Sequence, residues 1–391
     1  MADLSSPIRV LICDDSAVIR STVSQLLRKD PELEIVGSAE NPYQARDKIL
    51  ELNPEVLLLD LEMPRMDGLS FLGIIMRERP MPVVIFSSLS QQGSRIAWDA
   101  MQRGAIEVLG KPRSPRELHD LAPILIYKLK AAALAGRGKS FQSHVDAAVA
   151  SSKAPSPVAA LKGNQVATAF TRTHTPEKEP VDCSHLDPKA LVLLGASTGG
   201  TEALKNVLVD LPADMPPILI VQHIPAYFSA SFANRLDSLC KLRVKEAKHG
   251  DVCQPGHVLV APGNYHMTVH PTTGGYRVKL DEGPRVWHQR PAVDLLMKSG
   301  AQAAGMHAVA GVLTGMGRDG AEGLLALRRR GALTFAQDEE TSVVYGMPRA
   351  AKEIGAAQRV LPLHRMAAFL QEATRTRRRP SPPTEHEVSS V

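Results

Sequence analysis

The sequence has few aromatic residues, few cysteines and no long apolar run. Aromatic residues make up 4% of the 391 residues, so the stacking platforms that bind single-stranded nucleic acid would be scarce. The four cysteines are scattered without the close pairs of a zinc or redox motif, and we expect reduced thiols. No stretch approaches a membrane-spanning length, and residues 1–10 lack the pattern of a secretion signal. We therefore expect a cytoplasmic protein without direct membrane insertion.

The charge of the chain is moderately basic, with a net charge of +5 and a pI near 9.0. Part of the excess lies in one segment, Arg375 and residues 377–379, beside Pro380. Such a stretch is typical of a solvated terminus, so we expect residues 376–391 to be a disordered basic and proline-rich tail. The charge therefore does not indicate a nucleic-acid partner, and we expect none.

Residues 7–128 repeat one unit, in which an apolar run is followed by a turn and a segment with helical periodicity. Most of the runs are too continuous for a sheet with one wet face. They are typical of a parallel sheet that is covered by helices on both sides. The runs are 8–13, 34–39, 56–59, 83–86 and 106–109.

A second domain is predicted further along the chain. From about residue 136 the composition changes to Ala, Ser, Lys, Thr and Pro without periodicity, so we predict a flexible linker over 129–186. A second α/β domain is then expected over 187–375. The fold class is therefore two doubly wound parallel-sheet domains, one flavodoxin-like and one Rossmann-like. Apolar runs of the second domain are 190–194, 218–221, 258–260 and 308–313, with helical patterns such as 201–210 between several of them.

Polar side chains follow the apolar runs of the first domain. Asp14 and Asp15 follow the first run and Asp60 the third, so their carboxylates should meet at one sheet edge, where such sheets bind ligands. Three acids repel one another, and Mg²⁺, which prefers oxygen ligands, would relieve this repulsion. Ser87 and Lys111 end the fourth and fifth runs, adding a hydroxyl and an ammonium. Asp60 could then act as a nucleophile that forms an acyl phosphate.

The alternative is that acids at strand ends only cap helices, and Asp14 and Asp15 alone favour that interpretation. The combination of the acidic pair with Asp60, Ser87 and Lys111 favours a phosphoryl-accepting site, because these polar groups stand at the ends of separate predicted strands. On these residues, 7–128 resembles the receiver domain of two-component response regulators. The resemblance implies that Asp60 is the phosphoacceptor and that Ser87 contacts the phosphoryl group.

The same resemblance implies further features of the receiver. Lys111 also contacts the phosphoryl group, and the Lys111–Pro112 bond is cis. Receivers often carry a switching aromatic three residues before this lysine, where this chain has Val108. The implied ligands of Mg²⁺ are Asp14, Asp15, Asp60 and the backbone carbonyl of Glu62.

A possible nucleophile lies in the second domain. Residues 195–200 read Gly-Ala-Ser-Thr-Gly-Gly, between an apolar run and a helix that begins near Thr201. Positions 195–199 fit G-x-S-x-G, a sharp turn that presents a serine oxygen, here that of Ser197, beside a helix N-terminus. The spacing fits neither G-x-G-x-x-G nor the P-loop, whose lysine is missing. For the motif alone, a tight turn without chemistry is an equal alternative.

A base and an orienting acid would complete a serine site. His223 follows the run 218–221, and Asp319 lies in a glycine-containing turn after the run 308–313. Alone, the histidine is more often structural and the aspartate more often a helix cap. Together with Ser197 they form a Ser, His, Asp set at the ends of three strands. The chain order differs from Ser, Asp, His, so an α/β-hydrolase fold is excluded.

Four strings of the second domain carry a second resemblance. In order they are residues 195–200, Gln-His-Ile-Pro at 222–225, Ala-Pro-Gly-Asn-Tyr-His at 261–266 and Leu-Thr-Gly-Met-Gly-Arg-Asp-Gly-Ala at 313–321. Through them, residues 187–375 resemble the catalytic domain of CheB-type protein-glutamate methylesterases. The implied roles are Ser197 as nucleophile, His223 as general base, Asp319 as its orienting acid and the Met316 backbone N–H as an oxyanion donor.

The resemblance implies an enzyme that demethylates glutamate methyl esters, and deamidates glutamines, on methyl-accepting chemotaxis receptors. It implies a chemotaxis histidine kinase as phosphoryl donor, Mg²⁺ in the receiver and no cofactor in the catalytic domain. A DNA-binding response regulator is the main alternative, but the second domain is much longer than a helix-turn-helix module needs. A NAD-binding domain is disfavoured because the glycine fingerprint is missing.

Overall fold

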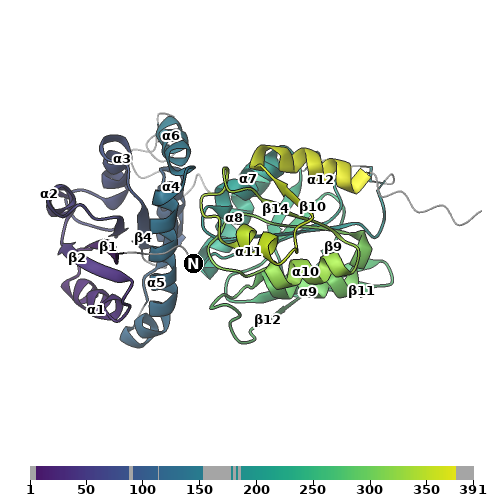
Figure 1. Ribbon diagram of the computed structural model, residues 1–391, viewed down its shortest axis with the longest axis horizontal. Helices are drawn as coiled ribbons and strands as arrows, with labels where there is room; N and C mark the ends of the chain where they lie inside the picture. The colour runs from purple at the N-terminus through teal and green to yellow at the C-terminus, as the bar shows by residue number, and fades with distance from the viewer. Residues whose placement is uncertain are drawn as a thin grey trace, which may run out of the picture.

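The computed structural model describes residues 6–87, 91–112, 114–152, 178, 182–183 and 186–375. The tail expected at 376–391 and residues 153–177 of the expected linker lie outside them. The described chain forms two α/β domains that pack against each other (Figure 1). Its helices include none that is long and apolar enough to cross a membrane. The four cysteines, all within the described ranges, are free, as expected.

The N-terminal domain is built on a five-stranded parallel sheet of order β2-β1-β3-β4-β5, the flavodoxin-like order. Successive side chains of β3 point to opposite faces of the sheet and enter two hydrophobic cores. Helices α2, α3 and α4 pack on one core, and helices α1 and α5 pack on the other. Each predicted run is confirmed as a strand within one residue at each end. The elements are β1 (Ile8–Cys13), α1 (Ala17–Leu27), β2 (Leu33–Ala39), α2 (Pro42–Leu52), β3 (Val56–Leu59), α3 (Gly68–Glu78), β4 (Val83–Ser87), α4 (Gln91–Gln102), β5 (Glu107–Gly110) and α5 (Pro115–Arg137).

The C-terminal domain has a seven-stranded parallel sheet of order β15-β14-β13-β6-β7-β10-β8. Helices α7, α8 and α12 cover one face, and α9, α10 and α11 cover the other. The second doubly wound domain is thus confirmed. The elements are β6 (Leu191–Ala196), α7 (Gly200–Val209), β7 (Ile218–Gln222), α8 (Ala226–Leu239), β8 (Arg243–Glu246), β10 (His257–Val260), α9 (Val293–Ala303), β13 (Ala308–Val312), α10 (Ala321–Arg329), β14 (Leu333–Gln337), α11 (Met347–Glu353), β15 (Arg359–Leu361) and α12 (Met366–Arg375).

Two features of the fold were not predicted. An antiparallel sheet of β9 (Val252–Cys253), β11 (His266–Thr272) and β12 (Gly275–Asp281) closes one side of the second domain. In the segment expected to be a linker, α5 continues to Arg137 and α6 spans Phe141–Ser152. Alanine-rich sequence has a high helix propensity, and Val145 of α6 is buried against the N-terminal core, so this part is helical.

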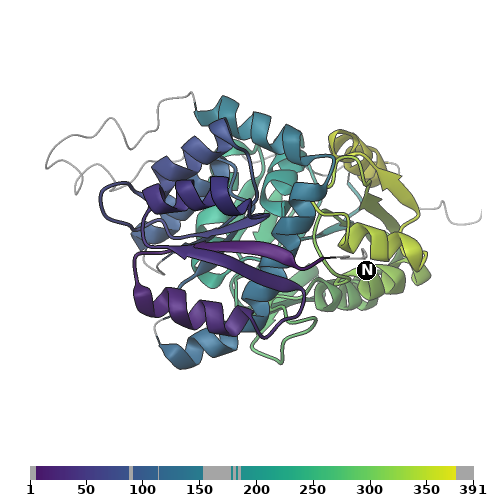
Figure 2. The ribbon, with the colours of Figure 1, turned by 60° about the vertical axis from the view of Figure 1, so that its left-hand side comes forward.

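The two domains share a packed interface. Figure 1 shows α4 and α5 on the side of the N-terminal domain that faces the second domain, and Figure 2 shows the purple and blue N-terminal elements in front of it. Phe228 of α8 joins the core of α3 and α4, and Val344 joins that of α5. Trp98 of α4 packs on Phe232 of α8, with ring centroids 5.9 Å apart. The interface therefore includes apolar side chains from both domains.

Candidate phosphoryl-acceptor and active sites

The predicted acidic site lies at the carboxyl edge of the N-terminal sheet. Asp14 follows β1, Asp60 follows β3 and Ser87 is the last residue of β4. These three residues are at most 2% exposed. Lys111, directly after β5, places its Nζ 2.7 Å from Asp14 Oδ2 and 2.7 Å from Asp60 Oδ2. The structure therefore brings the predicted acids and the lysine together.

The carboxylates of this site fit a divalent cation. Asp14, Asp15 and Asp60 can each offer an oxygen, and these oxygens lie within 4.8 Å of one another. Burial raises the pKa of Asp60 to about 6, although the nearby Lys111 ammonium lowers it. The Glu62 N–H donates to Asp60 Oδ1 at 3.2 Å, which places the Glu62 backbone beside the cluster. Hard oxygen ligands and a buried charge that a cation would relieve are the donor set that suits Mg²⁺.

One backbone expectation is wrong. The described residues contain one cis peptide bond, Arg290–Pro291, so the Lys111–Pro112 bond is trans. The trans isomer is the one that an X-Pro bond prefers, by about 0.5–1 kcal/mol. The Lys111 N–H donates to Ser87 O at 2.7 Å, and the ammonium reaches both aspartates with the bond trans.

Ser197 lies in the turn between β6 and α7, where the sequence places it. Gly199 has a φ of 76°, and a Cβ there would lie 2.5 Å from Val343 Cβ, so the turn requires glycine. The Ser197 N–H donates to Thr314 O at 2.9 Å, and the Gly200 N–H donates to Ser197 O at 2.7 Å. Ser197 is 1% exposed, and its Oγ has no hydrogen-bond partner among the described residues. The hydroxyl is therefore held in place by its backbone and is free to react.

His223 directly follows β7, the neighbour of β6, and its N–H donates to Ala196 O at 3.1 Å. Its Nε2 lies 2.8 Å from Asp319 Oδ2. Because Nε2 faces a carboxylate, it carries the proton of the neutral imidazole, and Nδ1 remains as the acceptor. Nδ1 is buried and makes no hydrogen bond with any described residue. It is the nitrogen that can serve as a base.

Asp319 is held by the start of α9. Its Oδ2 accepts from the Val293 N–H at 2.7 Å and its Oδ1 from the Asp294 N–H at 2.8 Å. Asp294 is 1% exposed and in turn accepts from Gly320 N–H at 3.1 Å and Gly323 N–H at 2.7 Å, at the start of α10. Each carboxylate thus caps the helix beside the other. Sequence reasoning missed Asp294, because an aspartate in the first turn of a helix is too common to single out.

The turn that contains Met316 packs directly on Ser197. A Cβ on Gly315 would lie 2.7 Å from Ser197 Cβ. The Met316 carbonyl accepts a hydrogen bond from the hydroxyl of Tyr127 on α5. Burial raises the pKa of Tyr127 well above its usual range, so this hydroxyl remains a donor at neutral pH. The N-terminal domain therefore contacts the turn that, by the family resemblance, would carry the oxyanion donor.

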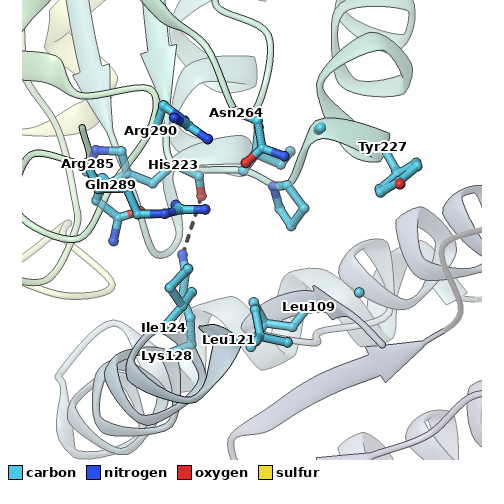
Figure 3. Close-up of a pocket in the computed structure, with 14 residues that line it drawn as sticks. Leu109, Leu121, Ile124, Lys128, His223, Tyr227, Asn264, Arg285, Gln289 and Arg290 are labelled. Atoms are coloured by element: carbon cyan, nitrogen blue, oxygen red, sulfur yellow. Dashed lines mark hydrogen bonds between the residues drawn. The ribbon is translucent and has the colours of Figure 1, made fainter. Parts of the chain in front are cut away.

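A buried ion pair connects the two sites. Glu107 Oε1 on β5 lies 2.8 Å from Lys128 Nζ on α5 and accepts from Thr198 Oγ1 at 2.5 Å. Lys128 also donates to His223 O at 3.4 Å (Figure 3). Glu107, Lys128 and Thr198 are at most 7% exposed. Because Thr198 follows Ser197 and β5 leads to Lys111, this network spans the interface between the two sites.

The fold and the sites together describe a protein that joins a candidate phosphoryl-acceptor domain to a candidate serine-hydrolase domain. A flavodoxin-like domain with a buried acidic crevice and its lysine is packed on an α/β domain that has a histidine–aspartate pair beside a serine turn. Two known families match in the same order. The response regulator receiver domain family matches residues 10–122, and the CheB methylesterase family matches residues 192–370.

Individual relatives match along most of the chain. Protein-glutamate methylesterase/protein-glutamine glutaminase 2 of Syntrophus aciditrophicus is 44% identical over 93% of this chain and 98% of that protein. The corresponding protein of Bdellovibrio bacteriovorus is 46% identical over 96% of this chain and 99% of that protein. The Thermotoga maritima CheB methylesterase catalytic domain is 39% identical, with a TM-score of 0.46, over 47% of this chain and 97% of that one. The chain belongs to the CheB methylesterase family with an N-terminal receiver domain, which confirms both resemblances.

Proposed function

We propose that this chain is a phosphorylation-regulated serine hydrolase that demethylates glutamate γ-methyl esters on methyl-accepting chemotaxis receptors. The observation that carries the proposal is the 2.8 Å contact between His223 Nε2 and Asp319 Oδ2, which leaves a buried Nδ1, unpaired among the described residues, on a residue that directly follows the strand paired with the strand before Ser197. Relatives that are 44–46% identical are named protein-glutamate methylesterase/protein-glutamine glutaminase. The chemistry follows from these three side chains.

In the first half-reaction, Ser197 Oγ attacks the γ-carbonyl carbon while His223 Nδ1 takes the hydroxyl proton. The carbonyl π electrons move to oxygen, and the oxyanion accepts from the Met316 N–H and is further stabilised by the positive potential at the start of α7. Asp319 stays ionised and stabilises the imidazolium. When the intermediate collapses, the C–O bond to methoxide breaks and His223 returns the proton, releasing methanol.

In the second half-reaction, His223 removes a proton from water, whose oxygen attacks the acyl carbon. The ester bond to Ser197 breaks, the serine oxygen regains a proton from His223, and a glutamate carboxyl group is released. An amide reacts through the same tetrahedral intermediate. Glutamine deamidation would therefore need no further residues, with ammonia as the leaving group in place of methanol.

In the receiver, the Asp60 carboxylate attacks the phosphorus of a phosphohistidine on a chemotaxis kinase, and the bond to the imidazole breaks. Mg²⁺, held by Asp14, Asp15, Asp60 and the Glu62 carbonyl, would neutralise charge on the phosphoryl oxygens. The new phosphoryl group competes for the Lys111 ammonium, which now pairs with Asp14 and Asp60. Ser87, whose buried Oγ has no partner in the described chain, can donate to it.

Regulation would act through the interface. Tyr127, Lys128 and Glu107 contact the turns that carry Met316, His223 and Thr198, so the receiver covers the active site in this arrangement. Phosphorylation must favour a receiver state with weaker contacts, because a modification without differential interaction shifts no equilibrium.

The test of the function is methanol release from methylated receptor membranes. Ser197→Ala should reduce turnover by several orders of magnitude, because only oxyanion stabilisation and binding remain. Circular dichroism should be unchanged, since the side chain is small and its Oγ makes no hydrogen bond in the described structure. Turnover retained by Ser197→Ala would end the serine mechanism.

A further inference from the structure

A pocket of about 190 Å³ lies between the domains, beside His223. Figure 3 shows its two walls. Helix α5 supplies one wall with Leu121, Ile124 and Lys128, and the catalytic domain supplies the other, one part of which, here called the polar wall, consists of polar side chains. The polar wall is made by Asn264, Arg285, Gln289 and Arg290.

The two arginines of the polar wall form no ion pair with a carboxylate of the described residues. The nearby Glu282 carboxylate is hydrogen-bonded to Tyr265 and raises the pKa of that tyrosine, which the Arg290 charge lowers. Arg290 Nη1 donates to the carbonyls of Glu282, at 2.6 Å, and Gly283, at 3.0 Å, which fixes its guanidinium in place. The pKa of Arg285 is lowered by burial and by the Arg290 charge, which indicates that the two guanidiniums are neighbours. Two adjacent cations are relieved by an anion.

The same wall contains buried donors that lack acceptors. Gln289 is 7% exposed, and its Nε2 has no hydrogen-bond partner among the described residues. The Arg290 Nε is likewise buried and unpaired. A buried donor without an acceptor destabilises the folded chain, because it has lost its hydrogen bonds to water. Both donors and both guanidiniums line one pocket, so a single carboxylate entering it could satisfy several of them.

We propose that Arg285, Gln289 and Arg290 form a specificity subsite that binds an acidic side chain flanking the ester-bearing glutamate of a protein substrate. This inference rests on the proposed function, because the subsite lies beside His223 and would position the neighbouring ester for attack. Guanidinium groups bind carboxylates through paired N–H···O hydrogen bonds. The wall formed by α5 closes the subsite, so the same contact that covers the active site also narrows access for an acidic segment.

The experiment uses the full chain and two helical peptides. Each contains one γ-methyl glutamate, flanked by glutamates in one peptide and by glutamines in the other. A charge-assisted hydrogen bond contributes about 1.5–3 kcal/mol, so the wild type should prefer the acidic peptide by roughly 10- to 100-fold in kcat/KM. Arg285→Gln and Arg290→Gln should each reduce this preference at least several-fold, mainly through KM. Arg359→Gln on the exposed edge strand β15 is the matched control and should keep it.

Charge reversal gives the sharper result. Arg285→Glu should invert the preference toward a third peptide, in which lysines flank the ester. Equal rates of the wild type on the acidic and glutamine peptides would overturn the subsite while leaving the esterase function intact. An equal loss on both peptides in Arg285→Gln would also overturn it, since it would indicate a structural role. A wild type that hydrolyses no peptide and no receptor would overturn the function and the subsite together.

Discussion

Replacing Asp60, the proposed phosphoacceptor, by its neutral isostere asparagine should stabilise the receiver. Asp60 is 1% exposed, and burial raises its pKa from 3.8 to about 6. A carboxyl whose pKa is higher in the folded chain contributes stability below its unfolded pKa, and that contribution is lost as pH rises through the folded pKa. Above pH 6 the ionised Asp60 therefore costs stability. Asp60→Asn removes this cost and leaves Lys111 paired with Asp14.

The size of the effect follows from the shift. About two pKa units, at about 1.4 kcal/mol each, correspond to about 3 kcal/mol. For a domain of this size the receiver transition of Asp60→Asn should lie on the order of 10 °C above the wild type at pH 8. The difference should decrease as pH falls from about 6 toward 4, where the wild-type carboxyl is protonated. Scanning calorimetry of the full chain over this pH range, without divalent ions, measures both.

Mg²⁺ provides the control for this experiment. It should raise the wild-type transition more than that of Asp60→Asn, because the variant has one anionic ligand fewer. Asp15→Asn is the matched variant: it neutralises an exposed proposed ligand and should weaken the response to Mg²⁺ without the stabilisation at pH 8. A transition of Asp60→Asn that is lower than the wild type at pH 8, or an offset independent of pH, would refute the reasoning.

Three further predictions concern the active site and the interface. Asp319→Asn should lower the rate of methanol release by roughly three to four orders of magnitude, because the His223 imidazole loses its anionic partner. A decrease of less than tenfold would remove Asp319 from the mechanism. Glu107→Gln leaves Lys128 buried without its anion, so the basal esterase activity of the unphosphorylated chain should rise several-fold, and adding Lys128→Met should partly restore the low basal activity. Unchanged basal activity in Glu107→Gln would show that this ion pair does not hold the two domains together. Gly199→Ala should lower the catalytic-domain Tm, since its φ of 76° and the contact with Val343 both oppose a Cβ; an unchanged Tm would contradict the strain argument.

The strands and the positions of the predicted residues could be obtained from the sequence, because both depend on local pattern. Continuous apolar runs predict buried parallel strands, and the carboxyl ends of such strands meet at one edge. Polar residues directly after different runs, such as Asp14 and Asp60 or Ser197 and His223, are therefore brought together by topology alone. The motif strings pointed to the family, which the relatives along the chain confirm.

Contacts between residues that lie far apart in the sequence, and that share no motif or periodicity, could be found only from the tertiary structure. Asp294 and Asp319 cap each other's helices, and Glu107 meets Thr198 across 91 residues of sequence. Which imidazole nitrogen of His223 faces the acid also depends on three-dimensional placement. The energies of such contacts come from desolvation and from paired charges in a buried interface. These quantities depend on what surrounds a side chain in space, and the residues before and after it in the sequence do not determine them.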